Sequence, residues 1–364
     1  MRCSLVLLLV AACGRFGFED EPPLGPPAHV ADTVTLGGTG TLVFGTSVID
    51  TTALTIDGGP PVRGQLVAVP QLGGGPELAL LQAEDITLGP GETLRIVGDR
   101  GLVIVARTIE IEGRIDASGA PGRPGPGAVA GDAQGGEHRV DDVCDSGGGG
   151  GGHATAGADG GEVTGCLPRR LGGASTGDTA LTILAGGGNG GAPASFGCPK
   201  ASGGGGGGAL QLSAAERIVI GAAGAVLAGG GGGTGGPECG DGDAGAGGGG
   251  GAGGAIYFEA PRIVIDGFVV ANGGGGGGGG NGQDQNGPIG VGGAGAPGIT
   301  REPALGGTRP ALNAGVGGTG GTEAQAPERG GFASNNAAGG GGSTGRIVIV
   351  GDVEISGVVA PSAN

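Results

Sequence analysis

Four cysteines carry the most specific chemistry in the chain. Cys144, Cys166, Cys198 and Cys239 stand in or beside glycine tracts, and no two of them show the C-x2-C or C-x4-C spacing of zinc sites. We therefore expect no thiolate metal site. An even number of cysteines in an exported chain predicts disulfides. Four cysteines allow three connectivities, of which we favour Cys144–Cys166 and Cys198–Cys239.

The histidines and the acidic clusters do not form a recognisable catalytic or metal motif. His29, His138 and His153 share no spacing and fit no metalloprotease or nucleophile pattern, so each is predicted to be a solvated loop residue. Two acidic clusters have metal-like spacing, but turn formation explains Asp-Gly equally well, and no metal or cofactor is predicted. The clusters are Asp141-Asp142 with Asp145, and Asp241-Gly-Asp243.

Charged residues alternate with aliphatic residues in several short segments. A glycosidase or lyase needs paired carboxylates or clustered bases on neighbouring strands. Here both signs of charge are mixed, so we predict a solvated face with arginine-to-acid contacts and no enzyme site. The residues concerned are Glu110, Glu112, Arg114, Asp116, Arg217, Arg262, Asp266, Asp352 and Glu354.

The elements that position these residues form an internal repeat. Each of its four copies reads as three short β-strands with glycine corners, at 102–119, 210–229, 256–273 and 346–360. Because strand side chains alternate between faces, Leu102 and Ile104 share one face with their counterparts in the other copies. Stacked copies would bury this aliphatic ladder, which predicts an all-β fold, a parallel right-handed β-helix, with a β-sandwich as the alternative. The residues from Glu77 to Ala83 are the one short helix candidate.

Glycine tracts separate the copies of the repeat. The chain has 101 glycines in 364 residues without a sustained Gly-X-Y period, so collagen is excluded. Flexible linkers are the default interpretation of such sequence. Polyglycine-II chains, however, pack closely and hydrogen-bond to one another, so we favour partly ordered glycine layers docked on the solenoid. The tracts are 147–152, 203–208, 229–233, 247–251 and 273–280.

Composition excludes several classes of binding protein. Aromatic residues make up 2% of the chain, with no Trp, and the formal net charge is −16. These values argue against a typical lectin, and the negative charge repels nucleic acid and anionic lipid heads.

The N-terminus is typical of a secretory signal. Met1-Arg2 precedes an apolar run at 5–10 that is too short to span a bilayer. Val10-Ala-Ala-Cys13 resembles the lipobox of bacterial lipoproteins, which implies removal of residues 1–12 and a lipid on Cys13. A chance cysteine in an ordinary signal is the alternative. Gly14 after the cysteine, rather than Asp, favours the outer membrane, and residues 13–33, rich in Pro and acid, are predicted to be a tether.

The body resembles the uncharacterised glycine-rich lipoproteins of myxobacteria and related deltaproteobacteria, which are often described as PE-PGRS-like although the PE module is missing here. The resemblance rests on Thr108-Ile-Glu-Ile-Glu-Gly-Arg-Ile-Asp-Ala-Ser-Gly119 followed by cysteine-bearing glycine tracts and further Ile-Val-Ile segments. It implies location and architecture but no activity. We expect a β-rich region at 34–119, a glycine-rich region at 120–345 and a last strand repeat at 346–364.

Together these features predict a non-enzymatic envelope lipoprotein with a structural or adhesive role. The alternative is a β-helical protein that binds or degrades polysaccharide. Expected partners are the membrane, through the lipid, and envelope or extracellular polysaccharide, but not nucleic acid. The oligomeric state stays open.

Overall fold

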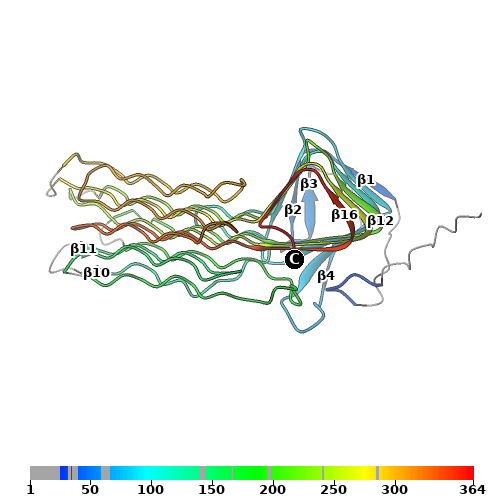
Figure 1. The fold of residues 1–364 in the computed structure, drawn as a ribbon, viewed down its shortest axis with the longest axis horizontal. Helices are drawn as coiled ribbons and strands as arrows, with labels where there is room; N and C mark the ends of the chain where they lie inside the picture. The colour runs from blue at the N-terminus through cyan, green and yellow to red at the C-terminus, as the bar shows by residue number, and fades with distance from the viewer. Residues whose placement is uncertain are drawn as a thin grey trace, which may run out of the picture.

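The computed structural model describes residues 25–31, 34, 40–58, 66–139, 144–165, 167–194, 198–199, 201–239, 242–283 and 287–364. A block of strands forms one end of the molecule, and the glycine tracts project from it along the longest axis (Figure 1). Within the described ranges the regular elements are all β-strands, and no helix has the length and apolar character needed to cross a bilayer.

The larger sheet has eight strands and is parallel along its main path, β1-β6-β8-β12-β14-β16. The repeat copies pair in register, with Leu102 opposite Leu210, Leu210 opposite Ile256, and Ile256 opposite Ile347. β5 pairs with the first half of β8, and β4 pairs with β5 in the antiparallel direction. The strands are β1 (Thr41–Phe44), β4 (Leu66–Val69), β5 (Leu78–Gln82), β6 (Asp85–Leu88), β8 (Gly101–Ile111), β12 (Ala209–Ile220), β14 (Ala255–Ile265) and β16 (Arg346–Ile355).

The second sheet has seven strands in the order β17-β15-β13-β9-β7-β2-β3. All neighbours are parallel except β2 and β3, which form an antiparallel pair. The strands are β2 (Ser47–Asp50), β3 (Thr55–Asp57), β7 (Thr93–Val97), β9 (Arg114–Asp116), β13 (Ala225–Leu227), β15 (Phe268–Val270) and β17 (Val358–Ala360). A separate hairpin joins β10 (His138–Arg139) to β11 (Cys144–Asp145).

The main hydrophobic core lies along the aliphatic ladder predicted from the repeat. Leu102, Leu210, Ile256 and Ile347 are fully buried in it. Burial fails only at the last copy, where Val353 and Ile355 are 41% and 47% exposed. In the described chain β16 has no neighbour on its far side, so nothing stacks on these side chains.

The helix candidate between Glu77 and Ala83 is wrong, because this segment forms β5. Leu78 and Leu80 contact one cluster of buried side chains, while Ala79 and Leu81 contact the main core. A segment buried on both faces shows a continuous apolar run, which cannot be distinguished from a short buried helix by periodicity.

The prediction of a right-handed parallel β-helix is also wrong. Each sheet includes an antiparallel pair, β4 with β5 in the larger sheet and β2 with β3 in the second, which a parallel β-helix lacks. The chain also does not coil from one copy directly into the next. Between β9 and β12, β13 and β14, and β15 and β16 it leaves the sheets and enters the glycine bundle. Parallel pairing between the copies was predictable, but side-chain alternation does not specify the path that the chain takes from one copy to the next.

The glycine tracts form an ordered bundle with a three-residue period. In the tract at 247–254, Gly247, Gly250 and Gly253 donate their N–H groups to the carbonyls of Ala337, Gly340 and Ser343. The second residue of each triplet (Gly248, Gly251 and Gly254) donates its N–H to a carbonyl in the tract at 228–234. The third residue donates to a third neighbour: Gly249 to Gly191, Ala252 to Gly188, and Ala255, just after the tract, to Gly208. Three residues per turn is the period of the polyproline-II helix, so each successive N–H points to a different neighbour.

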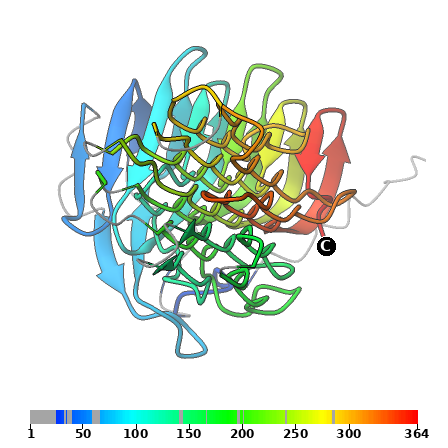
Figure 2. The ribbon, with the colours of Figure 1, turned by 90° about the vertical axis from the view of Figure 1, so that its left-hand side faces the viewer.

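The same tract is surrounded by further chains, which donate to its carbonyls. Three further segments each supply two donors to these carbonyls: Gly148 and Gly151, Gly204 and Gly207, and Gly274 and Gly277. Six neighbouring segments therefore contact one central chain through backbone hydrogen bonds. Figure 2 looks along the bundle and shows the tracts packed in layers in front of the strands.

Close packing in the bundle requires the absence of side chains. A Cβ atom on Gly249 would lie 1.9 Å from the carbonyl oxygen of Gly149, and one on Gly150 would lie 1.9 Å from that of Gly341. Contacts below 3.0 Å cannot be accommodated without moving the backbone. Glycine is therefore needed in the tracts for close approach and not for turns.

Candidate functional site

The three histidines occupy separate places, and all three contradict the prediction of solvated loop residues. His29 and His153 are each only 2% exposed. His138 lies in the hairpin, with its Nδ1 2.5 Å from Oδ1 of Asp145. Burial raises the pKa of the Asp145 carboxyl, an effect that the contact with His138 opposes. The structure does not bring the three imidazoles together.

His153 packs where the glycine bundle meets the larger sheet. Its Nδ1 lies 2.8 Å from the carbonyl oxygen of Gly253, and its backbone N–H donates to Oγ of Ser343 at 2.8 Å. Burial, together with the charge of Arg346, lowers the pKa of His153 to about 4. The side chain is therefore neutral at neutral pH and acts as a packing group.

His29 belongs to a buried polar cluster on the outer face of the larger sheet. Gln211 connects it to Glu259: His29 Nδ1 lies 2.7 Å from Gln211 Oε1, and Gln211 Nε2 donates to Glu259 Oε1 at 2.8 Å. Ser213 and the backbone N–H of Ala28 also donate to Glu259. Tyr257 meets the His29 ring edge-on at 4.8 Å. These contacts hold residues 28–30, within the predicted tether, against the sheet.

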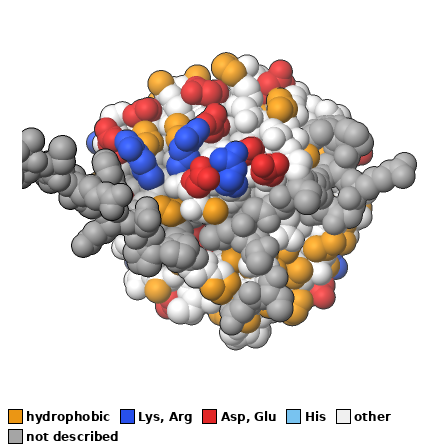
Figure 3. Space-filling view, turned by 90° about the vertical axis from the view of Figure 1, so that its right-hand side faces the viewer, with side chains coloured by type: hydrophobic (Ala, Val, Ile, Leu, Met, Phe, Trp, Pro, Cys, Tyr) orange, Lys and Arg blue, Asp and Glu red, His pale blue; other side chains and the backbone are white. Residues whose placement is uncertain are grey.

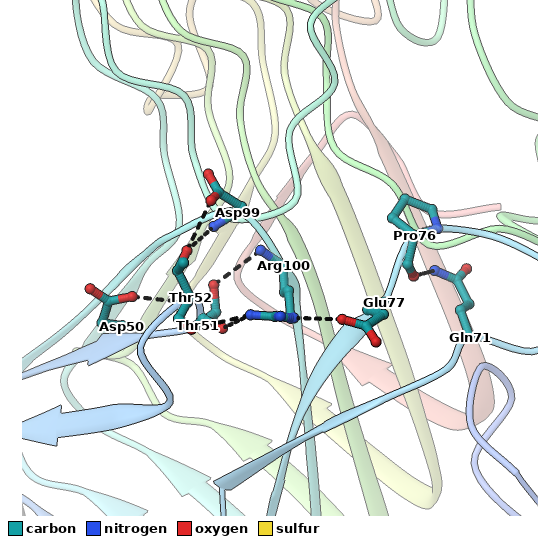
Figure 4. A network of polar contacts seen from close by, with 8 residues as sticks. All are labelled: Asp50, Thr51, Thr52, Gln71, Pro76, Glu77, Asp99 and Arg100. Atoms are coloured by element: carbon teal, nitrogen blue, oxygen red, sulfur yellow. Dashed lines mark hydrogen bonds and ion pairs between the residues drawn. The ribbon is translucent and has the colours of Figure 1, made fainter.

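A second polar network joins turns at the margin of the two sheets. The guanidinium of Arg100 donates to the carbonyls of Thr51 and Thr52 and to Glu77 (Figure 4). Asp99 and Asp50 bind the same turn, through the Thr52 hydroxyl and its backbone N–H respectively. All these groups are paired with one another, so the network stabilises the turns and offers no reactive group.

The cysteine prediction is confirmed for one pair. Cys198 and Cys239 form a disulfide, with Cα atoms 4.5 Å apart. Cys144 is also disulfide-bonded, and Cys166 lies outside the described residues. Cys13 lies outside them as well, so its lipidation stays a prediction.

The acidic clusters form no metal site in the described part of the chain. Asp141, Asp142 and Asp241 fall outside it, and no group of three or more His, Cys, Asp or Glu residues within it could hold an ion. Asp243 accepts a backbone hydrogen bond from Cys239 through its carbonyl, and Gly242 has φ of +88°. This is the turn that the Asp-Gly sequence suggested.

The charged residues of the larger sheet form the solvated ladder that was predicted. Arg107 binds Asp85 at 2.7 Å and Glu216 at 3.1 Å, and Arg217 binds Glu110 at 2.6 Å. Figure 3 looks at the face opposite the glycine bundle and shows basic and acidic side chains side by side. Exposed pairs of this kind contribute roughly 0 to 1 kcal/mol each. Each carboxylate named here has an arginine partner, which is unlike a pair of catalytic acids.

The strongest candidate site is a hollow between the second sheet and the glycine bundle, which we call the arginine hollow. It has a volume of about 340 Å³ and is lined by Arg95, Arg114 and Arg123, with Asp116 as the single acidic residue. Arg95 and Arg114 both contact Oδ2 of Asp116 at 2.9 Å. Three arginines and one aspartate leave an excess of two positive charges in a chain whose formal net charge is −16.

The strand register positions this cluster. Arg95 of β7 lies opposite Asp116 of β9, and Arg114 precedes Asp116 by two residues on the same face. Burial raises the pKa of Asp116, but the charges of Arg95 and Arg114 and hydrogen bonds from Ser118 outweigh it, so the net pKa is lowered. Asp116 is therefore an ionised partner that fixes both guanidinium groups.

Arg114 and Asp116 were predicted to be charged residues on the solvated face, but their proximity to Arg95 and Arg123 was not predicted. The residues Arg95 and Asp116 are 21 positions apart in the sequence, and only the pairing of β7 with β9 brings them together. Arg123 comes from the loop after β9. Outward arginines on neighbouring predicted strands were the signal that could have indicated the cluster.

The comparisons with known proteins assign no family. No family model matches the chain, and no curated protein or solved structure is significantly similar to it. The chemistry of the described residues is therefore the basis for a functional proposal.

Proposed function

We propose that this chain is a non-enzymatic protein of the bacterial cell envelope with a structural or adhesive role. In this proposal Cys13 carries a lipid that anchors the chain to the outer membrane, and the glycine bundle holds loops and side chains away from the anchor. The proposal is supported chiefly by one observation, the backbone hydrogen bonds that connect the tract at 247–254 to six neighbouring segments.

Such a bundle suits a mechanical role. Its cohesion comes from backbone groups that are paired in several directions, so bending one tract disturbs hydrogen bonds to several others. A bundle whose tracts meet mainly through backbone groups is of low chemical reactivity. These properties fit a spacer or surface projection better than they fit a catalyst.

The test compares cells that carry the chain with cells from which it has been deleted. Fewer deletion cells should remain attached to a polysaccharide-coated surface under flow, and wild-type protein should restore attachment. Unchanged attachment together with an unchanged envelope would contradict the proposed role. Release of reducing ends when the purified protein is incubated with a polysaccharide panel would show that the protein is an enzyme.

Polysaccharide binding is a second candidate function. It is favoured by the arginine hollow, which has an excess of positive charge and a volume within the range of about 300 to 1,000 Å³ found for small-molecule sites. Binding of this kind is compatible with the adhesive role.

A further inference from the structure

The arginine hollow has unused capacity for binding an anion. Each guanidinium has five N–H donors. The contacts of Arg95 and Arg114 with Asp116, and of Arg95 with the carbonyl of Ser118 at 2.8 Å, use a minority of these donors. Nε of Arg114 is buried without a hydrogen-bond partner, so the donors that can reach an anion are the remaining Nη groups of Arg95 and Arg114 and the guanidinium of Arg123. Arg123 forms no ion pair with any described residue.

The rest of the lining suits a hydroxylated ligand. Gly232 lines the hollow and no described N–H donates to its carbonyl, whereas the carbonyl of Gly295 lies against the Cα of Gly232. Carbonyls without a partner accept hydrogen bonds from hydroxyl groups. Pro121, Pro297 and Ile299 add apolar surface that the C–H face of a sugar ring could cover.

We propose that the arginine hollow binds the oxyanion of an acidic sugar unit, with the anion on the guanidinium groups and a sugar hydroxyl on the carbonyl of Gly232. Arginine binds carboxylates and sulfates through two parallel N–H donors, so both groups share the required chemistry. Asp116 fixes Arg95 and Arg114 in advance, which lowers the entropy lost on binding. The inference rests on the proposed adhesive role, for which it names a ligand class.

The test measures binding of the purified full-length protein by calorimetry. The probes are oligogalacturonate, which carries carboxylates, sulfated dextran, which carries sulfate esters, and unmodified dextran and inorganic phosphate as references. We expect oligogalacturonate or sulfated dextran to bind, with affinity falling as salt is added, and dextran not to bind.

Two variants locate the binding. Arg123→Gln changes an exposed loop residue and should weaken binding of the acidic probe at least tenfold, and Arg114→Lys should also weaken it by removing the bidentate donor. Arg217→Gln is the matched control, because it removes the same charge from the ion-pair ladder and should leave binding unchanged.

The inference is overturned if neither acidic polymer binds, if phosphate alone binds, or if Arg123→Gln and Arg217→Gln have equal effects. Which polymer binds identifies the anion as carboxylate or sulfate. Loss of binding in Arg123→Gln with retained cell attachment would confirm the site while separating it from adhesion. Loss of attachment in the deletion cells without binding of either probe would reject the site alone.

Discussion

At the scale of single residues, His153 shows how burial controls charge in this protein. It is nearly inaccessible and lies against the backbone of Gly253, where a charged imidazole would lose its hydration. The nearby charge of Arg346 further disfavours protonation. The folded state therefore requires the neutral form.

The lowered pKa of His153 predicts a loss of stability in acid. Above about pH 6.5 His153 is neutral in both the folded and the unfolded state, so its titration does not change the free energy of unfolding. As the pH falls from 6.5 toward 4, the unfolded chain binds a proton that the folded protein does not, so unfolding becomes easier by up to about 3 kcal/mol. Urea unfolding at several pH values should show this loss.

The variant His153→Gln should lose that component of the pH dependence. Gly45→Ala is the control, because it removes and adds no titratable group. Equal pH slopes for wild type and His153→Gln would contradict the assignment. Other carboxyls titrate in the same range, so the difference between the two proteins is the quantity to measure.

At the scale of elements, each glycine tract is held by neighbours rather than by its own conformational preference. Ordering a residue costs about 1 to 2 kcal/mol of backbone entropy, and glycine buries no side chain in return. Backbone hydrogen bonds and close contacts between tracts must offset this cost. A single added methyl group should therefore have a large effect inside the bundle and a small one outside.

Gly249→Ala should lower the free energy of unfolding by about 1 to 3 kcal/mol, because the new Cβ would collide with the carbonyl of Gly149. The control is Gly45→Ala, where the nearest atom to an added Cβ is Oε2 of Glu92 at 3.8 Å. That variant should stay within about 0.5 kcal/mol of wild type. Calorimetric unfolding of the three proteins measures both effects, and equal stabilities would show that Gly249 is not closely packed in solution.

Hydrogen exchange tests whether the tracts are ordered layers. Amides in 203–208 and 273–280, such as those of Gly204 and Gly277, donate to neighbouring tracts and should exchange far more slowly than a random coil. Reduction of Cys198–Cys239 should speed their exchange, because the crosslink restrains the loops that join the tracts. Residues 218–220 and 263–265 should stay protected by burial in the aliphatic core. Coil-like exchange in the oxidised protein would show the tracts to be linkers.

At the scale of the whole molecule, strands and glycine bundle form one continuous structure. β12 and β14 come from the glycine-rich part of the sequence, yet they pair with β8 and β16 from the flanking regions. Each strand repeat thus contributes strands to the two sheets and is connected directly to glycine tracts of the bundle. A force on the far end of the bundle would be carried into the parallel ladder.

The proposed lipid on Cys13 belongs to the same scale, because it would decide where the whole molecule is held. Cys13→Ser should abolish labelling with radioactive palmitate and release the protein from the membrane fraction. Conversely, Ser substitution at Cys198 should leave labelling intact. Continued labelling of the Cys13→Ser protein would contradict the lipobox assignment, and fractionation of wild-type cells would show whether the anchor lies in the outer membrane.

Part of the architecture could be predicted because it depends on side-chain patterns that recur. Alternation at Leu102 and Ile104, repeated at Leu210 and Leu212, identified the strands, their inward faces and their stacking in register. The arginine-to-acid ladder followed from the outward positions of the same strands. β5 was missed because residues buried on both faces do not alternate.

The sequence by itself determined the strands of the repeat and which face of each is apolar, since a side chain at every second position carries that information. It did not determine the path between copies or the neighbours of each tract. Gly249 differs in no side chain from Gly204 or Gly191, so only the folded arrangement decides that it hydrogen-bonds to both. The same holds for the arginine hollow, where the pairing of β7 with β9 brings Arg95 and Arg114 to the carboxylate of Asp116. Every glycine offers the same N–H and C=O groups and no side chain, so the sequence does not specify which glycines hydrogen-bond to each other. Only the tertiary structure decides these pairs.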